Sequence, residues 1–377
     1  MTAAARRWLR LGSVLLLPPA GGCLAGDVPA RSVPSRPGAV APAAGAPTAG
    51  FPPLATKRIG RLDYVGVADV ARQLDLKLTW PEAGRKFVLA GASARAELEA
   101  DTRDITVNGL RVFLGDPVVS VGGQCYVSRG DFERCLVPML RPGHGLPARP
   151  APKVIVLDAG HGGNDPGYRN AKLGTNEKTF ALDVARRTRK LLEAQDYRVV
   201  MTREDDSFVA LPQRAALANV ARADAFVSLH FNALGSDTKT SGVEIYTFAP
   251  RAQRSTNAWS PMEKNDTEDF ASPGNRFDHW NVVLAHAIHR RFVVNLKTAD
   301  RGKKLMHSGV LRPLNCPGVL VECGFLTSDT EARKIATPAY RQQLADALAA
   351  GIRDYAATLG RPRAPAPAAP PRVETSR

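Results

Sequence analysis

The sequence predicts an α/β fold with a mainly parallel or mixed central sheet flanked by helices, preceded by a small α+β module. Two observations support this prediction. From residue 153 onward, short aliphatic runs alternate with longer segments of helical periodicity, which is the pattern of a largely parallel sheet covered by helices. Residues 57–140 instead contain one helical segment and several short strands, with a "VNG" turn that is typical of a hairpin.

Stretches rich in proline, alanine and glycine separate these two regions from each other and from the chain ends. Such stretches contain too few large apolar residues to offset the entropy lost on ordering. The predicted order is an export signal at 1–25, a linker at 26–56, the module at 57–140, a second linker at 141–152, the α/β domain at 153–360 and a disordered basic tail at 361–377.

The first 25 residues have the layout of an export signal: arginines, a short apolar run and then small residues. The apolar run is too short to span a bilayer, so we expect an exported protein of the periplasm or cell envelope. Cys23 follows Ala-Gly-Gly, which loosely resembles a bacterial lipoprotein cleavage box. Two alternatives stay open: membrane attachment through a lipidated Cys23, or simple cleavage nearby, for instance after Ala25.

The formal net charge of the chain is +15, which suits an acidic partner such as an anionic lipid or an anionic cell-wall polymer. No compact block of Lys and Arg with interleaved aromatic residues is present, so we expect no nucleic acid partner.

Four cysteines remain besides the one in the export signal. Cys125 and Cys135 lie ten residues apart, and Cys316 and Cys323 lie seven apart, a spacing that matches no zinc finger. An exported chain permits disulfides. The alternatives are therefore two bridges, Cys125–Cys135 and Cys316–Cys323, or separate buried thiols.

In the module, we expect a helix at 67–78 and strands at 86–91, 96–100, 105–115 and 125–136. The order "VGVADVARQLDLKLTW … ITVNG … YVSRGDFE" resembles the stalk-like domain named after the copper amine oxidase N-terminal domain. This resemblance brings no catalytic signature and implies no copper.

The α/β domain has five strand-like runs, at 153–158, 197–203, 225–231, 242–248 and 318–325. Helical periodicity covers 177–195, 210–223, 279–296 and 340–359. An irregular polar insertion at about 249–279 is either a surface loop or a lid that regulates access to a site.

Polar residues stand where these strands end, and sites in open α/β sheets gather beyond the carboxyl ends of strands. His161 follows the first strand, His230 ends "AFVSLH" and Glu322 ends "GVLVE", while Glu177 lies in the first turn of a helix. Two histidines and one carboxylate are a ligand set of catalytic zinc, and the second carboxylate could transfer the proton of a water.

Each of these residues also has a simpler interpretation. A histidine at a strand end is commonly just a hydrogen-bonded polar residue, and Glu177 suits the positive end of a helix dipole. Glu322 could instead form an ion pair with Arg203 or Arg214.

Residues 154 to about 358 resemble the type 3 family of zinc-dependent N-acetylmuramoyl-L-alanine amidases, which cut stem peptides from the glycan of peptidoglycan. The resemblance runs in order through "VIVLDAGHGGNDPG", "GTNEKTFALDVARRTRKLLEAQDYRVVMTREDD", "LPQRAALANVARADAFVSLHFNA", "SGVEIYTF" and "VLRPLNCPGVLVECGFLTSDTEA". It implies a central mixed sheet flanked by helices.

The resemblance also implies one Zn²⁺ per catalytic domain, with His161, Glu177 and His230 as ligands and Glu322 as the catalytic residue. The implied reaction is hydrolysis of the amide between N-acetylmuramic acid and L-alanine, in cell-wall remodelling or daughter-cell separation. The partner would be peptidoglycan, with an envelope activator or septal partner as a further candidate. The glycines of "GHGG" would leave room for metal and substrate, since the motif lacks the Lys-Ser/Thr ending of a phosphate-binding loop.

Three further residues are candidates for substrate binding. Asn232, two residues after His230, would hydrogen-bond substrate or orient the site, or would merely form a turn. Arg203 and Arg214 would contact substrate or form a structural ion pair. Two rival functions stay open: a non-catalytic peptidoglycan-binding protein, and a zinc peptidase or deacetylase acting on the cell wall.

Overall fold

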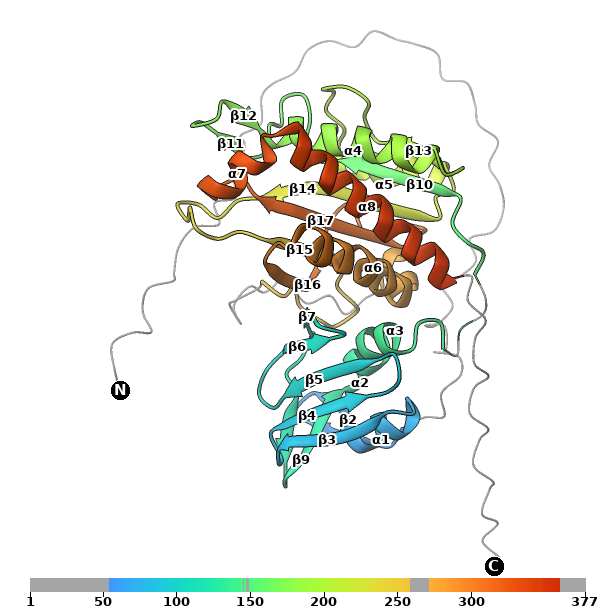
Figure 1. Ribbon diagram of the computed structural model, residues 1–377. Helices are drawn as coiled ribbons and strands as arrows, with labels where there is room; N and C mark the ends of the chain where they lie inside the picture. Colours follow the sequence, from blue (N-terminus) through green and yellow to red (C-terminus); the bar gives the residue numbers. More distant parts are fainter. Residues whose placement is uncertain (1–53, 145, 147–148, 258–270, 360–377) are drawn as a thin grey trace, which may run out of the picture. The chain divides into compact units, whose positions relative to one another are not determined.

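The computed structural model describes residues 54–359, apart from 145, 147–148 and 258–270 (Figure 1). The predicted export signal with Cys23, nearly all of the first linker, the centre of the insertion and the basic tail lie outside the described residues. Within the described part of the chain, no helix has the length and apolar character needed to cross a membrane.

The α/β domain is built on a mixed sheet, as the sequence predicts. Its strands, in spatial order, are β13 (Arg198–Met201), β10 (Val154–Ala159), β14 (Ala225–Asn232), β17 (Gly318–Phe325), β15 (Val243–Phe248) and β16 (Asp300–Met306). Neighbouring strands are parallel except β15 and β17, which are antiparallel. All five predicted strands are therefore confirmed, and β16 was missed.

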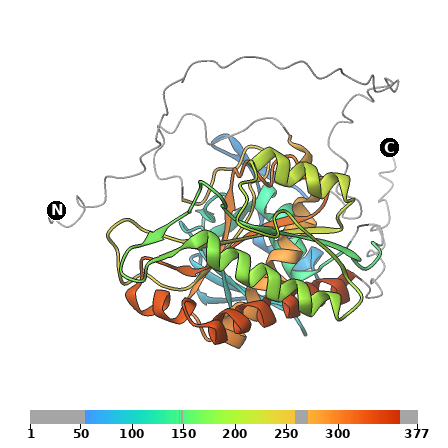
Figure 2. The same cartoon turned by 90° about the horizontal axis from the view of Figure 1, so that it is seen from above.

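Helices cover both faces of this sheet (Figure 2). One face packs against α4 (Glu177–Glu193), α6 (Asp278–Leu296) and α8 (Pro338–Leu359), and the other against α5 (Leu211–Val220). Strand residues alternate between the two cores: Val227 and Val319 face the first, Phe226 and Leu320 the second. Shorter elements complete the domain: β11 (Arg169–Asn170), β12 (Thr175–Asn176), η2 (Pro273–Phe277) and α7 (Asp329–Ile335).

The module begins with β1 (Thr56–Ile59), β2 (Leu62–Gly66) and α1 (Val67–Gln73). Six short strands follow: β3 (Lys77–Glu82), β4 (Lys86–Ala90), β5 (Arg95–Glu99), β6 (Asp104–Val107), β7 (Leu110–Phe113) and β8 (Val119–Val121). It ends with β9 (Gln124–Ser128), α2 (Arg129–Asp131), η1 (Phe132–Leu136) and α3 (Val137–Leu140). The hairpin prediction is confirmed, because β6 and β7 pair across Asn108 and Gly109, whose φ angles are 52° and 80°.

Two predictions in the module are wrong in part. The helix at 67–78 ends at Gln73, because Asp75 adopts a φ of 50° and the chain then enters β3. The strand at 125–136 ends at Ser128, whose Oγ accepts a hydrogen bond from the backbone N–H of Asp131. This cap begins a helical run at a point where the apolar pattern alone indicated a strand.

The sheet of the α/β domain continues into the module. Strand β7 pairs in parallel with β16, with Val112 opposite Lys303, so that β7, β6, β5, β4 and β3 extend one sheet to eleven strands. The backbone N–H of Arg111 donates to Asp300 Oδ2 at 2.8 Å across the same junction. A second sheet, in the order β1-β2-β9-β8, completes the module.

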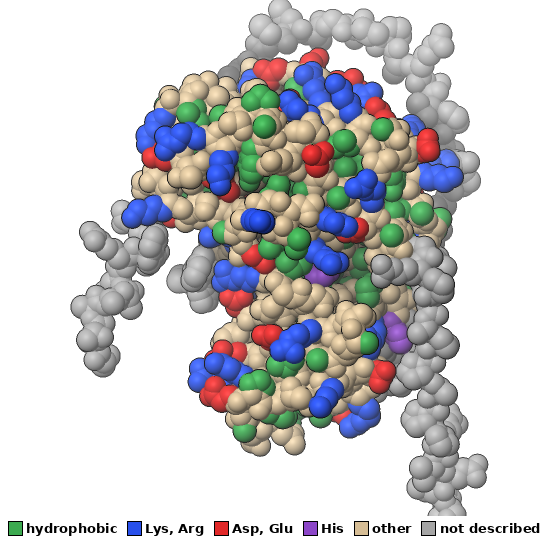
Figure 3. Space-filling view, in the orientation of Figure 1, with side chains coloured by type: hydrophobic (Ala, Val, Ile, Leu, Met, Phe, Trp, Pro, Cys, Tyr) green, Lys and Arg blue, Asp and Glu red, His purple; other side chains and the backbone are tan. Residues whose placement is uncertain are grey.

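The side chains show no disulfide among the described cysteines: Cys125, Cys135, Cys316 and Cys323 are separate buried thiols. Cys323 lies in the core on the α4 side of the sheet, so it faces away from the side of Glu322. On the face drawn in Figure 3, Lys and Arg side chains are scattered among Asp and Glu and form no single block.

A partly buried acid at the start of α6, Asp278, makes stability depend on pH. Burial raises the pKa of Asp278 from 3.8 to about 7, against the effects of Asn275 and Arg134. The folded protein then keeps a proton that the unfolded chain releases, so the free energy of unfolding should fall as the pH rises from about 4 to about 7. Urea unfolding of the metal-free chain across this range should show that slope in the wild type and a flatter one in Asp278→Asn. Equal slopes would contradict the assignment.

Candidate metal centre

The site lies on the α5 side of the sheet, where three neighbouring strands carry polar residues in register. His230 on β14 lies opposite Glu322 on β17, and Glu322 lies opposite Glu244 on β15. By strand alternation these side chains share the face of Phe226 and Leu320, which pack against α5. The apolar face thus becomes a row of ionisable groups at the carboxyl ends of β14 and β17.

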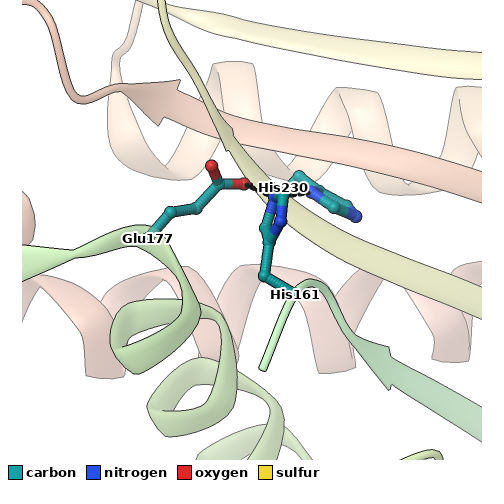
Figure 4. Close-up of side chains that lie close together, drawn as sticks. All are labelled: His161, Glu177 and His230. Carbon is teal, nitrogen blue, oxygen red and sulfur yellow. Dashed lines mark hydrogen bonds and ion pairs between the residues drawn. The ribbon is translucent and has the colours of Figure 1, made fainter. Parts of the chain in front are cut away.

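Three of the four predicted chemical residues meet directly (Figure 4). Glu177 comes from the first turn of α4, His161 from the turn after β10, and His230 from the end of β14. Glu177 Oε1 lies 3.0 Å from His161 Nε2 and 3.0 Å from His230 Nδ1, and the two nitrogens are 3.1 Å apart. Two imidazole nitrogens and a carboxylate oxygen facing one point form a donor set that fits Zn²⁺.

The turn that carries His161 needs its glycines. A Cβ on Gly160 would lie 2.4 Å from the ring of His230, and one on Gly162 would lie 2.1 Å from the carbonyl oxygen of Ser207. His161 itself adopts a φ of 60°, a strained conformation for a residue other than glycine. The motif is therefore a tight turn that brings one imidazole against another.

Arg203 and Arg214 stabilise this turn through hydrogen bonds to its backbone. Both side chains are buried, at 3% and 2% exposure. Arg203 Nη2 donates to the carbonyl of Gly160 and Arg214 Nη2 to that of His161, both at 2.8 Å. Arg214 also forms a buried ion pair with Asp158, 2.7 Å between Nη1 and Oδ1. These contacts position backbone and leave neither guanidinium open to a substrate.

Glu177 is fixed by the backbone as well as by the histidines. Its Oε1 accepts the N–H of Phe231 and its Oε2 that of Tyr168, each at 3.0 Å. Burial acts to raise the pKa of Glu177, but hydrogen bonds from His161 and His230 outweigh it and hold that pKa well below its usual range. The carboxylate is thus charged and fixed in the orientation of a ligand.

Asp165 is a site residue that the sequence reasoning missed, although it lies inside the quoted "GHGGNDPG" motif. Its Oδ2 is 2.8 Å from His161 Nδ1, and its Oδ1 accepts the N–H of Gly167 at 3.0 Å. A carboxylate on the far nitrogen of a metal-binding imidazole fixes its tautomer and leaves Nε2 free for the metal.

We expect Asp165→Asn to weaken zinc binding by about 10- to 100-fold without unfolding the protein. The amide can still accept from Gly167, but it no longer orients the imidazole of His161 by charge. Competition with a chromophoric chelator measures the affinity. Asp206→Asn, which alters an exposed carboxylate bonded to the same loop, is the control, and equal affinity in all three proteins would refute the role of Asp165.

Glu322 lies beside the three ligands without joining them. Burial raises its pKa well above the usual range, and the charges of Glu177 and Glu244 raise it further. Within the described part of the chain, its Oε2 is buried and has no hydrogen-bond partner. The alternative ion pair with Arg203 or Arg214 is not what the structure shows, because both guanidiniums bond to the turn. Among the described residues, Glu322 is thus a carboxyl group with a buried, unpartnered oxygen beside the ligand set, which is a placement that suits proton exchange with a molecule bound there.

A second group of residues, here called the Glu244 cluster, comprises Asn232, Glu244, Tyr246, Arg301 and Lys304. Glu244 Oε1 is bound by Arg301 at 2.9 Å and Lys304 at 2.7 Å. Its Oε2 accepts from Asn232 at 3.0 Å and from Tyr246 at 2.6 Å. Burial acts to raise the pKa of Glu244, but the charge of Lys304 and these hydrogen bonds lower it. Asn232 is thus held by a charged carboxylate that the sequence reasoning did not single out.

Comparison with known proteins covers the part of the chain that carries these residues. A sequence model of the N-acetylmuramoyl-L-alanine amidase family matches residues 155–354. The amidase AmiC of Escherichia coli O6:H1 (strain CFT073) is 33% identical over 256 residues, which cover 62% of this chain and 61% of that protein. AmiC of Neisseria meningitidis serogroup B is 31% identical over 264 residues, or 64% of this chain and 62% of that protein.

The chain is also similar to a crystal structure of an N-acetylmuramoyl-L-alanine amidase from Clostridium difficile 630, with 31% sequence identity and a TM-score of 0.45. The match covers 54% of this chain and 97% of the chain in that crystal structure. The chain spans about three fifths of the length of the curated relatives it matches.

Proposed function

Because the chain belongs to the N-acetylmuramoyl-L-alanine amidase family, we propose that it hydrolyses the amide bond between N-acetylmuramic acid and the L-alanine of the peptidoglycan stem peptide. The observation that carries this proposal is the meeting of His161, Glu177 and His230 beside Glu322, whose Oε2 has no hydrogen-bond partner among the described residues. The three residues form a metal-ligand set, and Glu322 beside them can act as general acid and base. All four residues lie within the range that the family model matches.

His161, Glu177 and His230 would hold one Zn²⁺ through Nε2, Oε1 and Nδ1. Their donor set fits this ion, and three protein ligands leave a fourth position for water or substrate. When bound, zinc polarises a carbonyl as a Lewis acid and lowers the pKa of a coordinated water to about 7.

The protein's own groups then have separate tasks. The positive charge of a bound Zn²⁺ would favour the ionised form of Glu322, whose Oε2 then takes a proton from the attacking water and later passes it to the nitrogen of L-alanine. The lactyl carbonyl carbon gains the water oxygen as the C–N bond breaks, which leaves a carboxylate on the sugar and a free amine on the peptide. Asp165 keeps the ring of His161 in place, and the Glu244 cluster orients Asn232 beside the reacting groups.

We place this activity at the cell envelope, in cell-wall remodelling or daughter-cell separation, because its substrate would be peptidoglycan. The names of two relatives, an N-acetylmuramoyl-L-alanine amidase and a probable cell wall amidase, support this location. Export through residues 1–25, lipid attachment at Cys23 and an envelope activator or septal partner stay predictions.

The identity of the cut bond separates this proposal from its rivals. Isolated cell-wall sacculi are digested with the zinc-loaded full-length protein, and the soluble products are identified by mass spectrometry. We expect intact stem peptides that begin with L-alanine. Shortened peptides would indicate a peptidase, and free acetate a deacetylase. Retained zinc without new fragments would indicate a binding protein.

A further inference from the structure

The first part of the insertion is anchored in the N-terminal module. We call residues 253–257 the insertion arm. The side chain of Gln253 is buried at 5% exposure, and its Nε2 donates to Asp131 Oδ1 at 3.1 Å. Asp131, 2% exposed, also binds the N–H of Gly115 and the hydroxyl of Ser128. A Cβ on Gly115 would lie 2.3 Å from Gln253 Nε2, so the module has a fitted place for this one side chain.

The middle of the arm joins the module to strand β16. Thr256 donates its N–H to the carbonyl of Leu305, and its Oγ1 accepts the N–H of Leu305, both at 2.9 Å. Arg103 of the module donates through Nη2 to the carbonyl of Thr256 at 3.2 Å. The arm is therefore held on both sides, with its backbone fixed relative to the sheet.

The end of the arm reaches the active site. Asn257 Nδ2 donates to the hydroxyl oxygen of Tyr246 at 2.8 Å, and that hydroxyl donates to Glu244 Oε2 at 2.6 Å. Glu244 lies opposite Glu322 in the register of β15 and β17. An unbroken series of contacts thus runs from Asp131 in the module to the strand pair that carries the catalytic residue.

A second route joins the module to the same cluster. The ammonium of Lys304, which binds Glu244, lies 5.6 Å from the ring centre of Phe113 at the end of β7. A Cβ on Gly302 would lie 2.9 Å from that ring, so the aromatic side chain packs directly on the backbone of β16. The cation over the ring limits where Lys304 can place its charge.

We propose that the N-terminal module contributes to catalysis. Through its contact with Gln253 of the insertion arm, through Asn257 at the end of that arm and through its own Phe113, it fixes the Glu244 cluster beside Glu322 and thereby sets kcat. This inference rests on the proposed amidase function. Gln253, Asn257 and Phe113 are positioning residues, since none of them touches the ligand set. If the module only tethered the catalytic domain, neither the buried contact between Asp131 and Gln253 nor the pairing of β7 with β16 would be required.

Point variants of the zinc-loaded full-length protein test the proposal. Gln253→Ala removes the anchor, Gly115→Ala displaces the Gln253 side chain, and Asn257→Ala breaks the contact with Tyr246. Each should lower kcat for stem-peptide release by about tenfold, the effect of one hydrogen bond of ordinary strength, with KM and zinc content unchanged. Arg95→Ala, which breaks an exposed ion pair with Glu97 in the module, should leave kcat as in the wild type.

Non-additivity separates positioning from a general loss of stability. If the arm acts as one connection, the double variant Gln253→Ala/Asn257→Ala should be within about twofold of either single variant. Losses of kcat that multiply, or a full kcat in Gln253→Ala and Gly115→Ala, would overturn the proposal. Thermal unfolding of each variant shows whether a fall in kcat follows a fall in stability instead.

Hydrogen exchange of the metal-free full-length protein tests the connection without any activity. Gln253→Ala should speed exchange in the arm and also in the segment 243–248, whereas Arg95→Ala should change neither. Unchanged exchange in 243–248 would refute the coupling. Failure of the proposed function would look different, since the wild type itself would then release no stem peptides.

Discussion

Replacing Glu322 with glutamine is expected to lower stem-peptide release by about 10²- to 10⁴-fold, the usual contribution of a positioned general acid and base. Glutamine keeps the shape of the side chain but cannot take a proton from water. Zinc content should be unchanged, because Glu322 is not one of the three ligands. Release of free L-alanyl peptides from purified sacculi, followed by mass spectrometry with zinc analysis of the same sample, measures both quantities.

A matched variant serves as the control for this experiment. Glu193→Gln alters an exposed carboxylate that pairs with Arg189 at the end of α4, and it should keep wild-type activity. Full activity in Glu322→Gln would show that another group transfers the proton. Loss of zinc together with activity would show instead that Glu322 is a ligand.

Replacing His161 with alanine should remove both bound zinc and activity, an effect larger than that of Asp165→Asn because a ligand itself is lost. Two remaining donors, Glu177 and His230, leave the ion without the three protein ligands that catalytic zinc sites use. Chelator treatment of the wild type should abolish activity, and added Zn²⁺ should restore it. The variant should stay inactive at the same zinc concentration. Stoichiometric zinc in His161→Ala would contradict the assigned ligand set.

The sequence was sufficient to predict those helices and strands whose apolar residues follow a single helical or strand pattern. Strands β10, β14 and β17 are largely apolar runs, with His161 in the turn after β10, His230 near the end of β14 and Glu322 in the second half of β17. The positions of these strands and the edge of the sheet that carries their polar residues could therefore be predicted from the sequence. Strand β16 could not be found this way, because it reads "DRGKKLM" and buries Lys303 and Lys304 at 1% and 6% exposure. Burial of these charges depends on partners such as Glu244, which come from elsewhere in the chain.

The same reason explains which site residues were missed. His161, His230 and Glu322 stand at strand ends, where topology alone brings them together. Asp165 and Glu244 act through contacts that depend on turn geometry and strand register, and neither has a periodic signal. The pairing of β7 with β16 was also unpredictable, since backbone hydrogen bonds at a sheet edge leave no pattern in side chains.

Hydrolysis in water enriched with ¹⁸O tests the central claim most directly. If water attacks the lactyl carbonyl of N-acetylmuramic acid beside Glu322, one ¹⁸O atom should appear in the lactyl carboxylate of the released glycan. The stem peptide should carry a free L-alanine amine and no label. Label in a peptide carboxylate, or cleavage at any other bond, would contradict the account.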